Sequence, residues 1–168
     1  TLHNLAIVLR DVGDYDRAMV LESEALEHFR LVRDARGIAV CLNSLGVNAA
    51  ERGDYATAVR WFAETLDLCR ALGSERGVAY ALHNQGEAAT RTGDLASAEA
   101  LLEEGLELAD RVGDRGLRAS LLTVMASAAF DGGVFIVNQG NGTVTRLDAT
   151  LSQASVFVSA FTPAPQLL

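Results

Sequence analysis

Lysine is absent from this 168-residue sequence, so all 14 basic side chains are arginines, and 22 acidic side chains bring the formal net charge to −8. This charge excludes a general electrostatic grip on nucleic acid or on an anionic membrane surface, because both need excess positive charge. The sequence also lacks an apolar run of the roughly 18 residues that a membrane-spanning helix needs. We therefore expect no direct nucleic-acid binding by this segment and no membrane association. The net charge favours a basic or mixed partner only weakly.

Cysteine is scarce as well, with Cys41 and Cys69 as the two thiols of the sequence. Two cysteines in a chain of this length do not make a disulfide framework, which predicts a reducing, cytoplasmic environment. We expect both to be small buried apolar residues, because neither their spacing nor a neighbouring histidine suggests a metal site. The opening residues lack a signal peptide and already show helical spacing, so we expect a piece of a longer protein.

Recognisable catalytic motifs are missing too. There is no Gly-rich phosphate loop ending in Lys, no His-Glu-x-x-His, no Cys-x-x-Cys and no nucleophile elbow. The acidic residues Glu22, Glu24 and Glu27 stand at helical spacing, and we expect all three on an exposed, solvated face together with His28. The sequence therefore predicts a protein without enzymatic activity, cofactor or metal.

Charge is distributed unevenly along the chain. Residues 134–168 carry one basic and one acidic side chain, Arg146 and Asp148, and the rest of the charge lies before them. Both prolines, Pro163 and Pro165, also fall in this second part. Two different kinds of polypeptide therefore meet near the Asp-Gly-Gly run at 131–133.

The first part repeats itself with a period of 40 residues. Such a period has to be recognised before secondary structure is assigned, because it dictates the fold. The positions that coincide in three copies include Gly13, Gly53 and Gly93, then Asp14, Asp54 and Asp94, then Ala18, Ala58 and Ala98, and Leu26, Leu66 and Leu106. A fourth, weaker copy begins at Asp114 and ends by Phe130.

Each copy predicts a helix, a tight Gly-Asp turn and a second helix. Apolar residues recur three and four positions apart, as at Ala58, Trp61 and Phe62, which is helical spacing. The turn glycines stand where the first helix must end in a left-handed residue, and the next Asp can cap the second helix. The small alanine one turn later lets the antiparallel pair approach closely. Trp61 and Phe62 are expected in the core.

The residues that carry a family resemblance are the run Leu42-Asn43-Ser44-Leu45-Gly46, the turn Gly53-Asp54-Tyr55, Ala58 and Phe62. They resemble the tetratricopeptide repeat in its longer variant of about 40 residues. The resemblance covers residues 1–130 and implies a mainly α fold, a right-handed helical solenoid of three and a half repeats. We expect these repeats at about 1–34, 35–74 and 75–113, with a partial repeat at 114–130. The third copy departs from the pattern at Gln85, where the first two have Leu.

The resemblance also implies a concave surface, lined by the first helix of each copy, that holds an extended peptide or a partner helix. In kinesin-light-chain-like and Pins-like members the matching positions are rich in Asn and bond the peptide backbone, for which an amide supplies both donor and acceptor. The residues expected to line this groove are His3, Asn4, Ile7, Arg10, Asn43, Ser44, Val47, His83, Asn84, Glu87 and Arg91. The alternative is that this polar row is merely solvated.

The tail at 131–168 alternates apolar and polar residues, which is typical of strands. Val134–Val137 and Thr143–Leu147 flank an Asn-Gly turn, a strong hairpin signal, and a third β-rich run covers Ala154–Phe161. The stretch resembles a single blade of a YVTN-type β-propeller, which cannot close alone. Three accounts stay open for this β-hairpin appendage: a cap on the last helix, a truncated further domain, or a sequence joined artificially to the repeats.

These observations predict a protein–protein interaction module within a larger bacterial signalling or transcription-regulating protein. The alternative is a non-catalytic scaffold segment of a multidomain ATPase or enzyme whose active site lies outside this chain. A third hypothesis is a propeller-bearing binding protein with the repeats as an accessory. The sequence leaves the oligomeric state and the partner's identity open.

Overall fold

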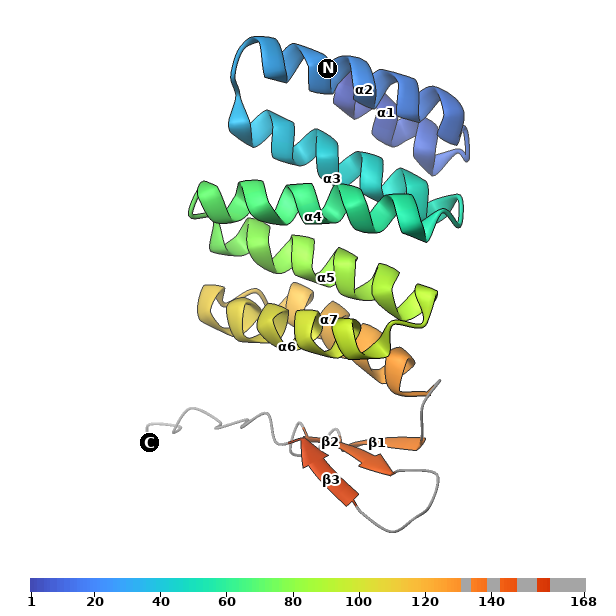
Figure 1. The fold of residues 1–168 in the computed structure, drawn as a ribbon, viewed down its shortest axis with the longest axis vertical. Coiled ribbons are helices and arrows are strands. Elements are labelled where there is room, and N and C mark those ends of the chain that lie inside the picture. Colours follow the sequence, from blue (N-terminus) through green and yellow to red (C-terminus); the bar gives the residue numbers. More distant parts are fainter. Residues whose placement is uncertain (131–133, 139–142, 148–153, 158–168) are drawn as a thin grey trace, which may run out of the picture. The chain divides into compact units, whose positions relative to one another are not determined.

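A computed structural model describes residues 1–130, 134–138, 143–147 and 154–157, and the described residues contain seven helices (Figure 1). The helices are α1 (Leu2–Asp11), α2 (Tyr15–Leu31), α3 (Ala35–Glu51), α4 (Tyr55–Ala71), α5 (Glu75–Thr92), α6 (Leu95–Val112) and α7 (Arg115–Phe130). The chain divides into two compact units, Thr1–Val124 and Met125–Leu168. The prediction of a mainly α array of helix-turn-helix copies is confirmed.

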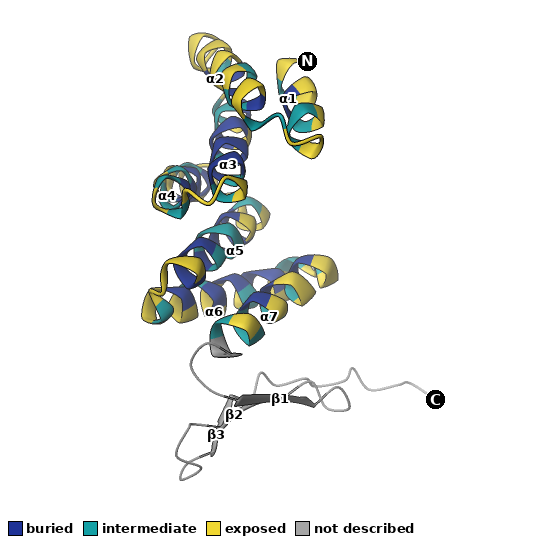
Figure 2. Cartoon of the chain, turned by 90° about the vertical axis from the view of Figure 1, so that its right-hand side faces the viewer, coloured by how far each residue is buried: buried dark blue, intermediate teal, exposed yellow. Residues whose placement is uncertain are grey.

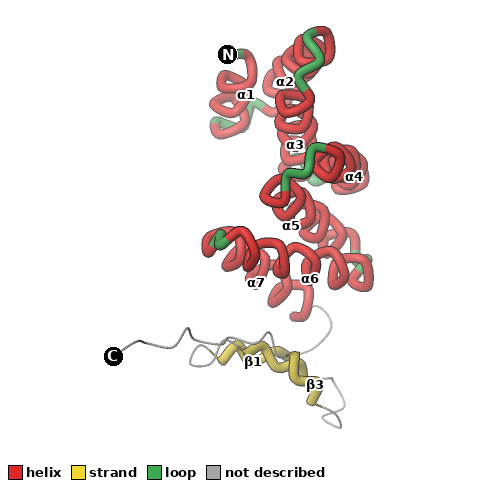
Figure 3. The backbone as a smooth tube through the Cα atoms, turned by 90° about the vertical axis from the view of Figure 1, so that its left-hand side faces the viewer, coloured by secondary structure: helices red, strands yellow, loops and turns green. Residues whose placement is uncertain are grey.

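The turns within the copies form as the sequence predicts. Gly13, Gly53 and Gly93 end the first helices with positive φ angles of 82°, 80° and 81°. The following Asp14, Asp54 and Asp94 each accept a hydrogen bond from a backbone N–H three residues later, which caps α2, α4 and α6. Figure 3 shows how short these loops are between the helices.

The core of the first unit lies between consecutive helices, since each of α1 to α5 contacts the next helix in sequence. One buried cluster joins α2 and α3 through residues such as Leu26 and Leu45, and Trp61 packs against it. A second cluster joins α3, α4 and α5 around Phe62, which is 2% exposed. The predicted core positions of Trp61 and Phe62 are therefore confirmed, and Cys41 and Cys69 are buried free thiols as expected.

Glycines allow the helices to pack this closely. A methyl group added to Gly46 would overlap the ring of Phe62, and one added to Gly37 would overlap the ring of Phe29. Gly77 lies in the same way against the Cys69 sulfur. In each case the facing side chain fills the space where the glycine has no Cβ, so the helix that carries the glycine and the helix that carries the side chain meet at van der Waals distance.

The first row of the array comprises α1, α3 and α5, because α3 contacts both of the others. The three helices differ in burial, as Figure 2 shows: α3 and α5 bury many residues, whereas α1 buries Ala6 alone.

One prediction about α2, the second helix of the first copy, is wrong. Glu22 on α2 is 2% exposed and therefore buried, although Glu24, Glu27 and His28 are exposed as expected.

In the second unit three strands pair antiparallel in the order β1-β2-β3. They are β1 (Val134–Asn138), β2 (Thr143–Leu147) and β3 (Ala154–Phe157). The junction at 131–133, the turn at 139–142, the end of the third run and both prolines lie outside the described residues. The hairpin appendage, the propeller-blade resemblance and the domain boundary between 130 and 131 stay predictions.

Among the helices that the structure describes, none has both the length and the apolar character needed to cross a membrane.

Candidate functional site

One cavity, the N-terminal pocket, has a volume of about 640 Å³ and is lined mainly by α1, α3, α5 and the end of α4. Six of the residues that the sequence predicts for the groove line it: His3, Ile7, Arg10, Asn43, Ser44 and Val47. These residues recur three and four positions apart along α1 and α3, so one face of each helix points into the same cavity.

A second cavity, the central pocket, has a volume of about 240 Å³ and lies between α3, α4 and α5. Asn84, Glu87 and Arg91 line it on α5, again at a spacing of three and four. Val47 lines both pockets, so the two cavities adjoin along α3. Together they follow the first row of the array over α1, α3 and α5.

Two predicted residues line neither pocket. Asn4 is exposed on α1, where its backbone N–H is capped by the Thr1 hydroxyl. His83 is half-buried, and its Nδ1 lies 3.0 Å from Asn84 Oδ1, so it contacts the polar row from one side. On α1 and on α5, therefore, one of the predicted groove residues lies outside the helix face that lines the pockets.

Sequence reasoning missed Arg36 and Tyr80, both of which line the N-terminal pocket. Arg36 stands seven residues before Asn43 on α3, and Tyr80 stands four residues before Asn84 on α5. Both spacings return to the same helix face. Extending the predicted face by one or two turns toward the helix N-termini would have found them.

An amide pair connects neighbouring helices at the boundary of the two pockets. Asn84 Nδ2 donates a hydrogen bond of 2.7 Å to Asn43 Oδ1. The Asn43 amide nitrogen makes no hydrogen bond to the described part of the chain, and Asn43 is only half-buried. Its two N–H donors can therefore meet an acceptor in the N-terminal pocket, such as a peptide carbonyl.

The two pockets differ in charge. The N-terminal pocket is lined by His3, Arg10 and Arg36 and by no acidic side chain of the described residues. The central pocket is lined by Glu51 and Glu87 as well as by one arginine. The larger cavity therefore presents basic groups in a chain whose net charge is −8, so overall and local charge have opposite signs.

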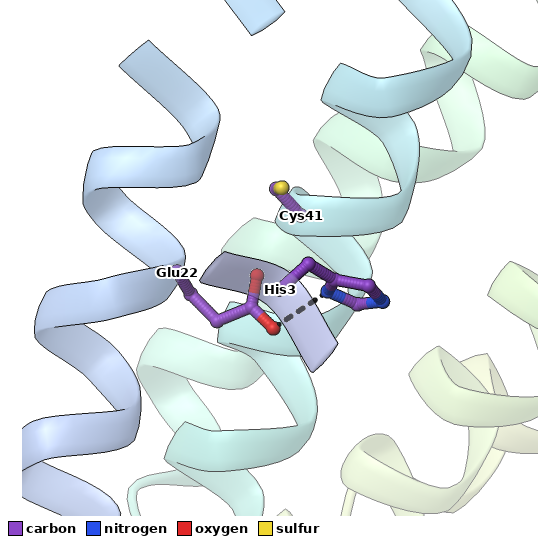
Figure 4. A group of neighbouring side chains, drawn as sticks. All are labelled: His3, Glu22 and Cys41. Carbon is purple, nitrogen blue, oxygen red and sulfur yellow. Dashed lines mark hydrogen bonds and ion pairs between the residues drawn. The ribbon is translucent and has the colours of Figure 1, made fainter. Parts of the chain in front are cut away.

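One edge of the N-terminal pocket adjoins a small buried cluster. His3 Nδ1 lies 2.8 Å from Glu22 Oε1, and one possible ligand atom from each of His3, Glu22 and Cys41 lies within 4.8 Å of the other two (Figure 4). Burial, then the negative charge of Glu22 and a hydrogen bond to its carboxylate, raise the pKa of the Cys41 thiol to about 12, so the thiol is protonated near neutral pH. These three side chains are the described residues able to hold a metal ion together.

Comparison with known families gives two overlapping matches. A family model described as tetratricopeptide repeat matches residues 1–71 and, one copy further on, residues 40–111, which together cover more than half of the chain. A search of curated proteins found no match.

Proposed function

The chain belongs to the tetratricopeptide repeat family, and from that premise we propose that the two pockets along α1, α3 and α5 form one groove for an extended peptide or a partner helix. Tetratricopeptide repeats generally mediate protein–protein interaction and are typically non-catalytic. The groove residues of the proposal are His3, Ile7, Arg10, Asn43, Ser44, Val47, Asn84, Glu87 and Arg91, whereas Asn4 and His83 line neither pocket.

The observation that carries this proposal is the Asn43–Asn84 amide pair. A half-buried amide that keeps two donors toward a cavity is suited to bind a backbone carbonyl without selecting a side chain. The hydrogen bond from Asn84 fixes the orientation of the Asn43 amide, so little side-chain entropy is lost when a ligand binds.

The charge of the N-terminal pocket indicates the chemistry of the ligand. Arg10 and Arg36 lie on neighbouring helices, and Arg36 forms no ion pair with the described residues. Guanidinium groups bind carboxylates through paired N–H donors. We therefore propose that the segment bound here carries an acidic side chain over α1 and α3.

The parent protein belongs to the proposal as well. Arrays with this 40-residue period, read with the buried free thiols Cys41 and Cys69, support a cytoplasmic module of a bacterial signalling or transcription-regulating protein. A scaffold segment of a multidomain ATPase or enzyme is the alternative. Both would use the same groove for a protein partner.

Fluorescence anisotropy with short labelled peptides tests the groove. The probes are two peptide sets of equal length and apolar content, one rich in Asp and Glu and one rich in Arg. We expect the acidic set to bind more tightly. Asn43→Ala and the double variant Arg10→Glu/Arg36→Glu should each weaken that binding by at least about tenfold.

Two matched controls locate the effect. Asn4→Ala removes an exposed amide that lines neither pocket, and Arg115→Glu reverses an exposed charge at the start of α7. Both should bind the acidic peptides like the unchanged chain, with helical circular dichroism intact in every variant. Equal losses at Asn4 and Asn43 would refute the groove, and tighter binding of the Arg-rich peptides would refute the ligand chemistry.

A further inference from the structure

Of the cluster formed by His3, Glu22 and Cys41, only His3 belongs to the proposed groove. The three side chains come from α1, α2 and α3, and Figure 4 shows them grouped at one point where these helices meet. All three donor atoms lie within 4.8 Å of one another. Imidazole nitrogen, carboxylate oxygen and thiol sulfur are the three donor types that zinc takes from proteins.

Glu22 stands at a position that the other copies give to an apolar core residue. Forty and eighty residues later the same position holds Phe62 and Leu102, which are 2% and 0% exposed. Glu22 is buried to the same degree, at 2%. Desolvating a carboxylate is unfavourable unless opposite charge and hydrogen bonds compensate it, so Glu22 needs a partner here, whereas Phe62 and Leu102 do not.

The contacts within the protein compensate only half of this carboxylate. Oε1 lies 2.8 Å from His3 Nδ1, but Oε2 is buried and has no hydrogen-bond partner. A buried polar atom left in this state destabilises the folded chain. The contacts of Glu22 with His3 and with the Cys41 thiol therefore leave Oε2 without a hydrogen bond, and a cation next to Oε2 would supply the missing partner.

We propose that His3, Glu22 and Cys41 bind a divalent transition-metal ion of the zinc type. Donor atoms bound to one such ion lie about 3–4 Å apart, given bonds of roughly 2.0–2.3 Å, so small side-chain rotations bring the three into range. On binding, the Cys41 thiol releases its proton to solvent and the thiolate forms the bond to the metal. One thiolate and one carboxylate then balance the charge of the ion, which leaves a neutral site in the core.

The position of His3 determines how a metal ion can enter the site and which helix the bound ion stabilises. Its side chain is 21% exposed and lines the N-terminal pocket, so an ion can enter from that side and a solvent molecule can complete the coordination. The bound ion links α1 to α2 and α3. Because α1 otherwise buries Ala6 alone, the link should stabilise this helix more than any other.

The test is a titration of the full chain with Co²⁺, a spectroscopic substitute for Zn²⁺. We expect one Co²⁺ per chain, a thiolate-to-cobalt charge-transfer band in the near ultraviolet, and loss of the band when Zn²⁺ is added. His3→Gln and Cys41→Ser should each weaken Zn²⁺ binding by more than about tenfold. Loss of a residue that only hydrogen-bonds a metal ligand already weakens metal binding about tenfold, and loss of a ligand should cost more.

The chain offers a matched control for each variant. His28→Gln removes an exposed histidine of α2, and Cys69→Ser removes the second buried thiol, which lies outside the cluster. Both should bind Co²⁺ like the unchanged chain. Absence of the charge-transfer band, or equal losses in Cys41→Ser and Cys69→Ser or in His3→Gln and His28→Gln, would overturn the proposal.

Hydrogen exchange provides a second readout that does not depend on the variants. Zn²⁺ should slow amide exchange in α1 more than in α5, because the ion holds α1 and does not touch α5. Equal protection of the two helices, or none in α1, contradicts the site. This readout is independent of peptide binding, so the groove and the metal site can fail separately.

Discussion

The first and second copies place the same residue types at the same positions with different results. Leu2 and Leu5 of α1 are 40% and 51% exposed, whereas Leu42 and Leu45 of α3, forty residues later, are 3% and 2% exposed. The helix α2 covers this face of α3, and no described helix covers the equivalent face of α1. Burial in a repeat array therefore comes from the neighbouring copy, while the sequence of a copy determines only which face is ready to be buried.

The most direct way to break this comparison is to truncate equivalent leucines. Leu45→Ala should lower the free energy of unfolding by about 2–5 kcal/mol, because it opens a cavity in the cluster between α2 and α3. Leu5→Ala should lower it by less than about 1 kcal/mol, because half of its side chain is already in water. Urea denaturation monitored by circular dichroism measures both. Equal costs would mean that the α1 face is covered in solution.

A smaller difference in stability is expected for substitutions in the two loops that join one copy to the next. Arg33 and Gly73 stand forty residues apart, and both have left-handed backbone with φ angles of 56° and 64°. A residue with a Cβ destabilises the chain by about 1 kcal/mol in this conformation. The native sequence already includes this cost at Arg33 but not at Gly73. Gly73→Ala should therefore destabilise the chain by about 1 kcal/mol, and Arg33→Ala by less than about 0.5 kcal/mol.

Thermal unfolding under identical conditions compares the two variants. Arg33 is exposed and Gly73 has no atom near its absent Cβ, so neither change disturbs packing. If Arg33→Ala is as costly as Gly73→Ala, the arginine side chain makes a stabilising contact and the two loops are not equivalent.

The smallest effect concerns ion pairs between successive second helices. Arg70 on α4 bonds both carboxylate oxygens of Glu104 on α6, at 2.7 and 2.9 Å. The equivalent Arg30 bonds Glu27 within its own helix rather than Glu64. A double-mutant cycle should give about 0.2–1 kcal/mol for the exposed Arg70–Glu104 pair and a coupling near zero for Arg30 and Glu64. Equal couplings would show that Arg30 changes partner in solution.

Local features of the fold could be predicted from the sequence because they depend on nearby residues. Gly53, Asp54 and Ala58 define a turn, a cap and a close helix contact within six positions, and period 40 repeats them. The groove face on α3 follows from helical spacing for the same reason. Its extension to Arg36 does not follow from the resemblance, because the Leu-Asn run that carries it begins at Leu42, which is C-terminal to Arg36 on the same helix.

The cluster of His3, Glu22 and Cys41 could not be predicted in this way. Its members lie on three helices, with His3 and Glu22 19 positions apart in the sequence, and no sequence spacing identifies them. Glu22 also shares helical spacing with the exposed Glu24 and Glu27, which suggested a solvated face. A useful signal was nevertheless present, since the 40-residue alignment sets Glu22 against Phe62. When a charged residue stands at a position that is apolar and buried in the other copies, something other than core packing accounts for the choice of residue at that position.

The glycine contacts at the junctions between copies make those junctions interchangeable. Phe29 lies over Gly37 at the first junction, and Cys69 lies against Gly77 at the equivalent place forty residues later. Excision of residues 35–74 would bring Phe29 against Gly77, where the absent Cβ leaves the same opening that Gly37 provides. An ancestral gene could thus lengthen or shorten the array by whole copies without inventing a new junction, and binding surfaces of different lengths become accessible to evolution through duplication and loss alone.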